Sequence, residues 1–254
     1  MTFETFAKTI ETSQLKGQHI FVQCLPKMGS TALSLSLANA VHEYNMEEAP
    51  LLMQRKNDSD FEEVRLKWLK KRQQSLLFKV DICTSMFMLT AEISDHSLTK
   101  VGYKRMLLNR SLRPWLKSIS NWSFLHSNYP RREAWENSYR NFVAQNDPEL
   151  QAIMPETLNS LRNMVLFWMP VWLTYQTLLD IQSPKWISGN WSLINNTRCS
   201  IPKPANRSQF SNAFRKQFDE LIPAMPQLQL SPDNNHLFQS ELRRKLLDRA
   251  ASAI

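Results

Sequence analysis

A short turn near the start of the chain carries residue types that bind phosphate or sulfate groups. Lys27, Gly29, Ser30 and Thr31 lie within one run of five residues. Lys27 supplies a positive charge, Gly29 lets the backbone approach a ligand closely, and the two hydroxyls add hydrogen-bond donors. If this turn joins a strand to a helix, backbone N–H groups also face the ligand. The pattern predicts an anion-binding loop, and an ordinary capped turn is the alternative.

The spacing of this turn differs from that of magnesium-dependent nucleotide sites. The signature G-x-x-x-x-G-K-[ST] needs a lysine directly before the hydroxyl residue, and Met28 and Gly29 precede Ser30 instead. The five histidines form no convincing ligand cluster, and the three cysteines lack zinc-site spacing. We therefore expect an anion site without a metal ion.

A second pair of polar residues follows a predicted strand at 104–109. Arg110 comes directly after this strand, and Ser118 follows eight residues later in a predicted helix that ends near 124. An arginine at a strand end and a hydroxyl two helical turns later can converge on one phosphate, where the guanidinium offers paired donors. Read alone, an arginine and a serine at this distance predict no particular ligand.

These two segments, in this order, resemble the sulfotransferase family. Its PKSGTT loop is matched by Pro26, Lys27, Gly29, Ser30 and Thr31, whereas Met28 and Ala32 depart from it. In the family this loop holds the 5′-phosphosulfate of 3′-phosphoadenosine 5′-phosphosulfate, and an Arg–Ser pair holds the 3′-phosphate. The resemblance therefore implies cofactor binding by residues 27–32, by Arg110 and by Ser118.

Two later segments are also similar to parts of this family. Tyr175 stands where members carry a tyrosine beside the adenine, in a segment that we expect to be a strand. Arg198, Lys203 and Arg207 stand where members carry a basic loop over the cofactor. The resemblance implies that these four residues also contact the cofactor, although a buried structural role for Tyr175 is an equal alternative.

Sulfuryl transfer proceeds through a loose in-line transition state, so it depends on positioning and charge stabilisation. The resemblance gives Lys27 the role of stabilising the leaving oxygen. Members place a general base two residues after a lysine at a strand end, and here Asp81 follows Lys79 in that way. A structural cap at Asp81 is the alternative, and the base is then sought among three other residues: Glu47, Glu48 and His42.

The elements around these residues predict an α/β fold. We expect one domain over 1–254, P-loop-like and three-layered, with a central and mostly parallel sheet flanked by helices. Hydrophobic residues make up 43% of the 254, enough for one ordinary core. Strands are expected at 19–25, 75–82, 104–109 and 170–178, and helices at 32–44, 60–74, 110–124, most of 131–165, 208–222 and 237–252. Residues 183–206 are expected to be largely loop.

The net charge of +8 favours an anionic partner. A nucleic-acid-binding module is one alternative, but no recognised module pattern supports it, so we expect no nucleic acid. The longest apolar stretch is too short to span a membrane, and no secretory leader is recognisable, so we expect a cytoplasmic protein. The expected function is transfer of a sulfuryl group to a hydroxyl or amine of a small molecule or glycan. The alternative is a nucleotide-binding protein of similar fold without this activity, either kinase-like or an inactive homologue.

Overall fold

The structure is a computed structural model that describes residues 8, 19–35, 37, 40–42, 48–55, 57–75, 80–84, 95–110, 112–125, 132–186, 192–195, 216, 218 and 240–248. Its internal contacts divide the chain into two compact units. Unit 1 comprises Met1–Arg110 and Ser183–Asn206, and unit 2 comprises Ser111–Gln182 and Arg207–Ile254. The expectation of one domain therefore stays a prediction.

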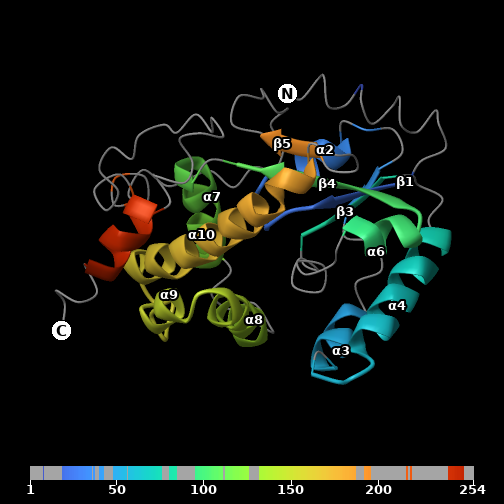
Figure 1. Cartoon of the computed structure of the whole chain (residues 1–254). Helices are drawn as coiled ribbons and strands as arrows, with labels where there is room; N and C mark the ends of the chain where they lie inside the picture. Colours follow the sequence, from blue (N-terminus) through green and yellow to red (C-terminus); the bar gives the residue numbers. More distant parts are fainter. Residues whose placement is uncertain are drawn as a thin grey trace. The chain divides into compact units, whose positions relative to one another are not determined.

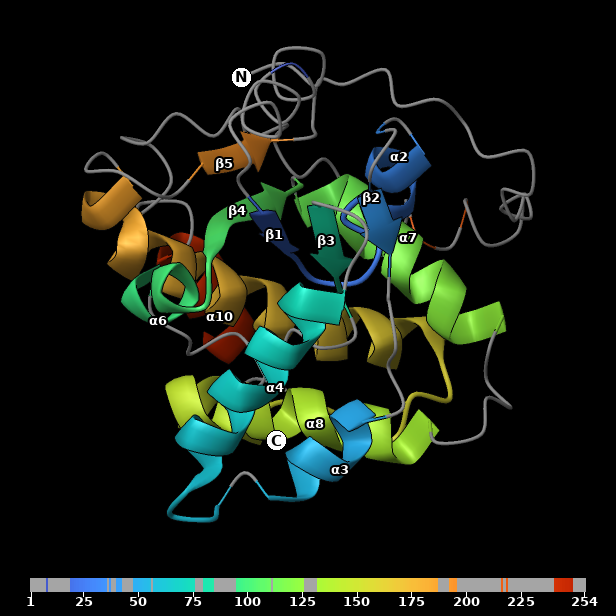
Figure 2. The same ribbon diagram turned by 90° about the vertical axis from the view of Figure 1, so that its right-hand side faces the viewer.

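Unit 1 is built on a parallel sheet. Within the described residues the sheet has five strands: β1 (His19–Gln23), β2 (Ala40–His42), β3 (Val80–Cys83), β4 (Tyr103–Asn109) and β5 (Ser192–Asn195). Their order is β2-β3-β1-β4-β5, which can be followed in Figure 2, and every neighbouring pair is parallel. The predicted α/β class with a parallel central sheet is confirmed.

The central position of β1 follows from its sequence. Ile20, Phe21 and Val22 are apolar in succession and fully buried, as expected for a strand covered on both faces. β3 pairs with one edge of β1 and β4 with the other, so all of its backbone groups find partners. The strands predicted near 19–25 and 104–109 are confirmed.

One helix of unit 1 packs against the sheet through apolar side chains. The described helices of unit 1 are α2 (Ser30–Leu35), α3 (Ala49–Gln54), α4 (Phe61–Ser75) and α6 (Asp95–Lys100), and Figure 1 shows α3 and α4 side by side. Phe61, Trp68 and Leu69 of α4 share one apolar cluster with Phe21 of β1 and Tyr103 of β4. The helix predicted at 60–74 is confirmed.

The helix predicted at 32–44 is wrong beyond its first turns. α2 ends at Leu35, and Ala40–His42 forms β2 beside β3. A helix through residue 44 would leave the outer edge of β3 without backbone partners, whereas β2 supplies them. The apolar spacing at 33–41 fits a helix, so local pattern alone favours the wrong element here.

The described part of unit 2 contains α7 (Leu112–Leu125), α8 (Arg132–Asn146), α9 (Pro148–Ala152) and α10 (Leu161–Trp186), of which the end from Ser183 onward belongs to unit 1. Residues 240–248 are also helical. Aromatic rings hold these helices together: Trp168 contacts the rings of Trp115, Trp135 and Tyr139. The Trp168 indole N–H also donates to the Ser123 hydroxyl at 3.0 Å, so this cluster is both packed and hydrogen-bonded.

The strand predicted at 170–178 is wrong, because this segment lies inside α10. Residues 164–176 are almost all buried, so apolar side chains surround the helix on every side. A continuous apolar run lacks the hydrophobic periodicity that would distinguish a helix from a strand. The bend-promoting Pro170 favours a strand or turn in isolation, but the helix continues through it. The loop expected over 183–206 is likewise interrupted, by the end of α10 and by β5.

The start of α9 shows how local sequence sets a helix terminus. The Asp147 carboxylate accepts a hydrogen bond from the Leu150 backbone N–H at 3.1 Å, and Pro148 occupies the first turn. Asp147 is therefore the N-cap of α9. The same carboxylate also binds Arg243 through two contacts, of 2.7 and 3.0 Å, and thereby ties the helical residues 240–248 to α9.

This ion pair makes the attachment of residues 240–248 dependent on pH. Burial tends to raise the pKa of the Asp147 carboxyl, but hydrogen bonds from Arg243 and the backbone, with the Arg243 charge, lower it below its ordinary value of 3.8. A lowered pKa stabilises the folded form above the ordinary value, and that stabilisation disappears as the pH falls through the lowered pKa. We expect the amides of 240–248 to lose protection from hydrogen exchange, relative to the intrinsic rate at each pH, below about pH 4.

The matched test of this pair is Arg243→Ala against Arg244→Ala. Arg244 forms an exposed ion pair with Asp248 of its own helix, so its loss should change stability by less than about 0.5 kcal/mol. Arg243→Ala should lower stability by about 1 kcal/mol and remove the acid dependence of exchange. Equal effects of the two substitutions would contradict this assignment.

Candidate functional site

The loop between β1 and α2 has an unusual backbone. Lys27 has φ of 64° and Gly29 has φ of 106°, so two of its residues adopt the left-handed region. Only glycine does so without strain, and a lysine held there marks a loop whose shape is fixed by its surroundings. Such alternation turns successive N–H groups toward one side and forms an anion-binding concavity. Gly29 then accepts the first helical bond, from the Leu33 N–H at 3.0 Å.

The sheet order places this loop at a topological switch point. The chain leaves β1 toward β2 on one side of the sheet, and it leaves β4 toward β5 on the other. The carboxyl ends of β1 and β4 therefore open a crevice between connections that diverge. In open parallel sheets, ligands bind at this position. The loop after β1 and the residue after β4 are thus neighbours at the place where a ligand is expected.

Arg110 links these two neighbours directly. Its guanidinium Nη1 donates a hydrogen bond to the Lys27 carbonyl oxygen at 3.0 Å, across 83 residues of sequence. The Asn109 carboxamide oxygen accepts from the Arg110 backbone N–H at 2.9 Å and fixes the chain as it leaves β4. The structure therefore brings Arg110 and the loop of Lys27 together, as the sequence pattern predicts.

The ammonium group of Lys27 is partly buried in this loop. Burial lowers the pKa of the Lys27 ammonium below its ordinary value of 10.5. A half-buried cation with a lowered pKa gains when an anion binds beside it, because the anion replaces lost hydration. Met28 and Ala32, the departures from the expected motif, are buried and pack the loop against unit 1. The loop therefore offers its backbone and Lys27, rather than these two side chains, to a ligand.

The two hydroxyls of the loop have different surroundings. Thr31 is exposed, and its carbonyl oxygen accepts from the Ser34 hydroxyl at 2.9 Å. Ser30 is buried, and its Oγ lies 2.9 Å from Nε2 of His42, the last residue of β2. Sequence reasoning includes His42 only as an alternative base. The contact between Ser30 and His42 could not be predicted from residue spacing. It depends on β2, and the apolar spacing of that segment fits a helix.

Asp81 does not have the environment of a general base. It is fully buried in β3, level with Phe21, and lies two positions before the residue paired with the end of β1. Both of its carboxylate oxygens bind Arg72 of α4, at 2.5 and 2.8 Å, and the Tyr103 hydroxyl donates to it at 3.3 Å. A base must reach the acceptor at the carboxyl edge of the sheet, so these contacts contradict the hypothesis. These contacts make Asp81 the buried ion-pair partner of Arg72, and its role as a cap stays a prediction.

The remaining predicted residues lie in unit 2 or outside the described part. Ser118 is half-buried in α7, and Tyr175 is buried in the helix α10 rather than in a strand. Both belong to unit 2, whereas the loop and Arg110 belong to unit 1. Predicted residues outside the described residues are Lys79, Arg198, Lys203, Arg207 and Glu47.

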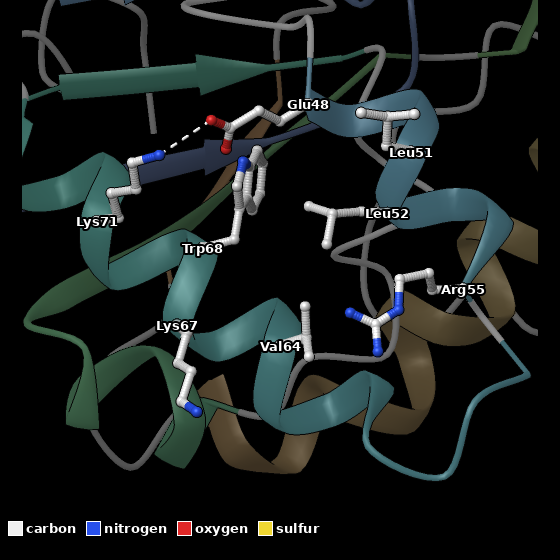
Figure 3. A pocket seen from close by; sticks show the side chains of 8 residues that line it. All are labelled: Glu48, Leu51, Leu52, Arg55, Val64, Lys67, Trp68 and Lys71. Atoms are coloured by element: carbon white, nitrogen blue, oxygen red, sulfur yellow. Dashed lines mark hydrogen bonds and ion pairs between the residues drawn. The ribbon is translucent and has the colours of Figure 1, made fainter.

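A groove of about 380 Å³ lies between α3 and α4 of unit 1. Figure 3 shows Leu52, Val64 and Trp68 forming its apolar floor, with charged side chains at the rim. Two positively charged side chains at the rim form ion pairs. Lys71 pairs with Glu48 at 3.0 Å, and Arg55 pairs with Asp58 and Asp60. Glu48, an alternative base, is thus bound to a lysine of α4. The groove is apolar with a neutralised rim.

No group of three or more potential metal ligands occurs among the described residues, and none of their helices is long and apolar enough to cross a membrane. The contacts described above define the candidate site as the β1–α2 loop, Arg110 and the Ser30–His42 pair. In comparisons with known proteins, no family model and no curated protein matches the chain.

Proposed function

We propose that this protein binds 3′-phosphoadenosine 5′-phosphosulfate and transfers its sulfuryl group to a hydroxyl or amine. One observation carries the proposal: the Arg110 guanidinium holds the backbone of the Lys27 loop at the switch point of a parallel sheet. One residue of each of two motifs that resemble different parts of one cofactor site is thereby in contact with the other. An accidental resemblance of two short segments does not require such a meeting.

The strand order supports a P-loop-like fold as the finer description. A central β1 is followed by a loop with left-handed residues and then by a helix, while β4 ends beside that loop with a basic residue. This arrangement suits a ligand with one anionic group in the loop and a second near Arg110. The proposed ligand carries such groups, as the 5′-phosphosulfate and the 3′-phosphate.

The chemistry proposed for these residues is charge stabilisation. As the sulfuryl group leaves, negative charge grows on the oxygen that bridges it to the phosphate. Lys27 and the loop N–H groups stabilise this charge, which arises only in the transition state. Arg110 fixes the loop and binds the 3′-phosphate. No described group requires a metal ion for these roles.

A second proposal is a nucleotide-binding protein without transfer activity. The observation that favours it is the ion pair of Asp81 with Arg72, which removes the predicted general base. Under this alternative the same loop and Arg110 bind the nucleotide, but no proton acceptor serves an acceptor hydroxyl. The two proposals agree on the ligand and differ on turnover.

Binding is tested by calorimetry with adenosine 3′,5′-bisphosphate, AMP and ATP. The bisphosphate should bind at least about tenfold more tightly than AMP, because Arg110 adds a charge-assisted hydrogen bond of about 1.5–3 kcal/mol. Arg110→Ala should bring the two affinities together, and Arg113→Ala, at the second residue of α7, serves as the matched control. Equal affinities in the unaltered protein would contradict the assignment.

Turnover is tested separately, by release of the bisphosphate from the phosphosulfate with phenolic, sugar and amine acceptors. Acceptor-dependent release supports the transferase. Tight binding without release under every acceptor favours the second proposal.

A further inference from the structure

The contact between Ser30 and His42 joins the anion loop to the edge of the sheet. Nε2 of His42 and Oγ of Ser30 are 2.9 Å apart, and both residues are at least partly buried. In the sheet, β2 lies two strands away from β1, so this contact requires α2 to lie beside β2, as Figure 2 shows. His42 is therefore the one histidine among the described residues that the structure places against the loop.

The direction of this hydrogen bond decides what Ser30 can offer to a ligand. A serine hydroxyl has one hydrogen to donate and two lone pairs that accept. If Nε2 lacks a hydrogen, Ser30 donates to it and has no hydrogen left for an anion. If Nε2 carries a hydrogen, Ser30 accepts from it and can donate its own hydrogen to the anion. The protonated imidazole carries a hydrogen on both nitrogens, so it always leaves Ser30 free to donate.

The charged groups of the elements next to His42 can be named. α2 contains no charged residue, and on β3 the neighbouring Asp81 is held by Arg72 on the opposite face from His42. The cations of the loop region are Lys27 and Arg110, which are placed to meet the ligand. Protonation of His42 therefore adds positive charge beside a site that already attracts anions.

We propose that His42 is a positioning residue for the anionic end of the nucleotide, and that its protonation turns Ser30 into a hydrogen-bond donor toward that anion. The inference rests on the proposed function, because its ligand is the phosphosulfate group of that nucleotide. The protein should therefore bind the phosphosulfate more tightly in mild acid than in mild base, because histidine changes its charge between about pH 5 and 8.

The probe is adenosine 5′-phosphosulfate, whose acidic groups remain ionised throughout this range and do not themselves titrate. Its affinity should rise about tenfold from about pH 8.5 to about pH 5.5, the effect of one hydrogen bond to a charged group. His42→Gln should give an affinity independent of pH, because the amide does not titrate. Ser30→Ala should lose most of the dependence while it keeps the histidine. His96→Gln, on α6, is the matched control and should keep the full dependence.

Each outcome separates this inference from the proposal on which it rests. If the unaltered protein binds neither adenosine 5′-phosphosulfate nor adenosine 3′,5′-bisphosphate, the anion site and the role of His42 both fail. If it binds adenosine 5′-phosphosulfate with an affinity that does not change with pH, the role of His42 alone fails. Full pH dependence in Ser30→Ala would also overturn it, because the histidine would then act without the hydroxyl.

Discussion

Asp81→Asn is expected to lower the free energy of unfolding by about 3 kcal/mol or more. Arg72 is buried, and its guanidinium contacts both oxygens of the Asp81 carboxylate. The substitution leaves a buried positive charge without its countercharge, and removal of one partner of such a pair is strongly destabilising. Chemical denaturation with urea, followed by circular dichroism, measures the change.

The matched control is Glu48→Gln. Glu48 pairs with Lys71, the residue before Arg72 on the same helix, but the Lys71 side chain is 72% exposed. Loss of an exposed pair should change stability by less than about 1 kcal/mol. The double substitution Arg72→Met with Asp81→Asn should recover part of the lost stability, because no buried charge remains. Unchanged stability with lost turnover in Asp81→Asn would instead restore Asp81 as the general base.

Lys27→Met is expected to lower turnover by about 100-fold to 1,000-fold, the usual effect of removing one donor to a developing negative charge. Methionine keeps an unbranched side chain of similar length, so the left-handed backbone at this position bears no added branch at Cβ. Affinity for adenosine 3′,5′-bisphosphate should fall much less, because that ligand carries no transition-state charge. Steady-state kinetics with a saturating acceptor, together with calorimetry, separates the two quantities.

The pH dependence of turnover adds a second readout for Lys27. Burial lowers the pKa of its ammonium from 10.5, so the charge is lost at a lower pH than in free lysine. Turnover should therefore decline on the alkaline side as the pH rises through this lowered pKa. Lys70→Met, an exposed residue of α4, is the control and should retain both the rate and its pH dependence. A Lys27→Met protein with unchanged turnover would remove Lys27 from the chemistry.

Elements with a clear local pattern could be predicted from the sequence. The apolar run of β1, the inward stripe of α4 and the capped start of α9 each carry their own signal. The central strand needs only apolar residues, and the cap needs only an aspartate before a proline. These elements depend little on the rest of the chain.

Elements that depend on distant partners could not be predicted. β2 exists because β3 offers an open edge, and α10 is helical although its apolar run fits a strand equally well. Asp81 has the spacing expected for a base, but Arg72 on another element decides its role. His42 is found beside Ser30 only once the order of the strands is known. Lys27 and Arg110 were singled out through the resemblance, and their contact likewise depends on the adjacency of β1 and β4 in the sheet.

The chain passes between the two units three times, after Arg110, after Gln182 and after Asn206. During synthesis on the ribosome, Met106 of β4 emerges well before Ser192 of β5, its partner in the sheet. Until then the outer edge of β4 is open, and open edges recruit strands from other chains. A truncated protein that stops at Arg110 would keep that edge permanently and should aggregate. Neither unit can thus be produced as one continuous piece, and expression trials should use the whole chain.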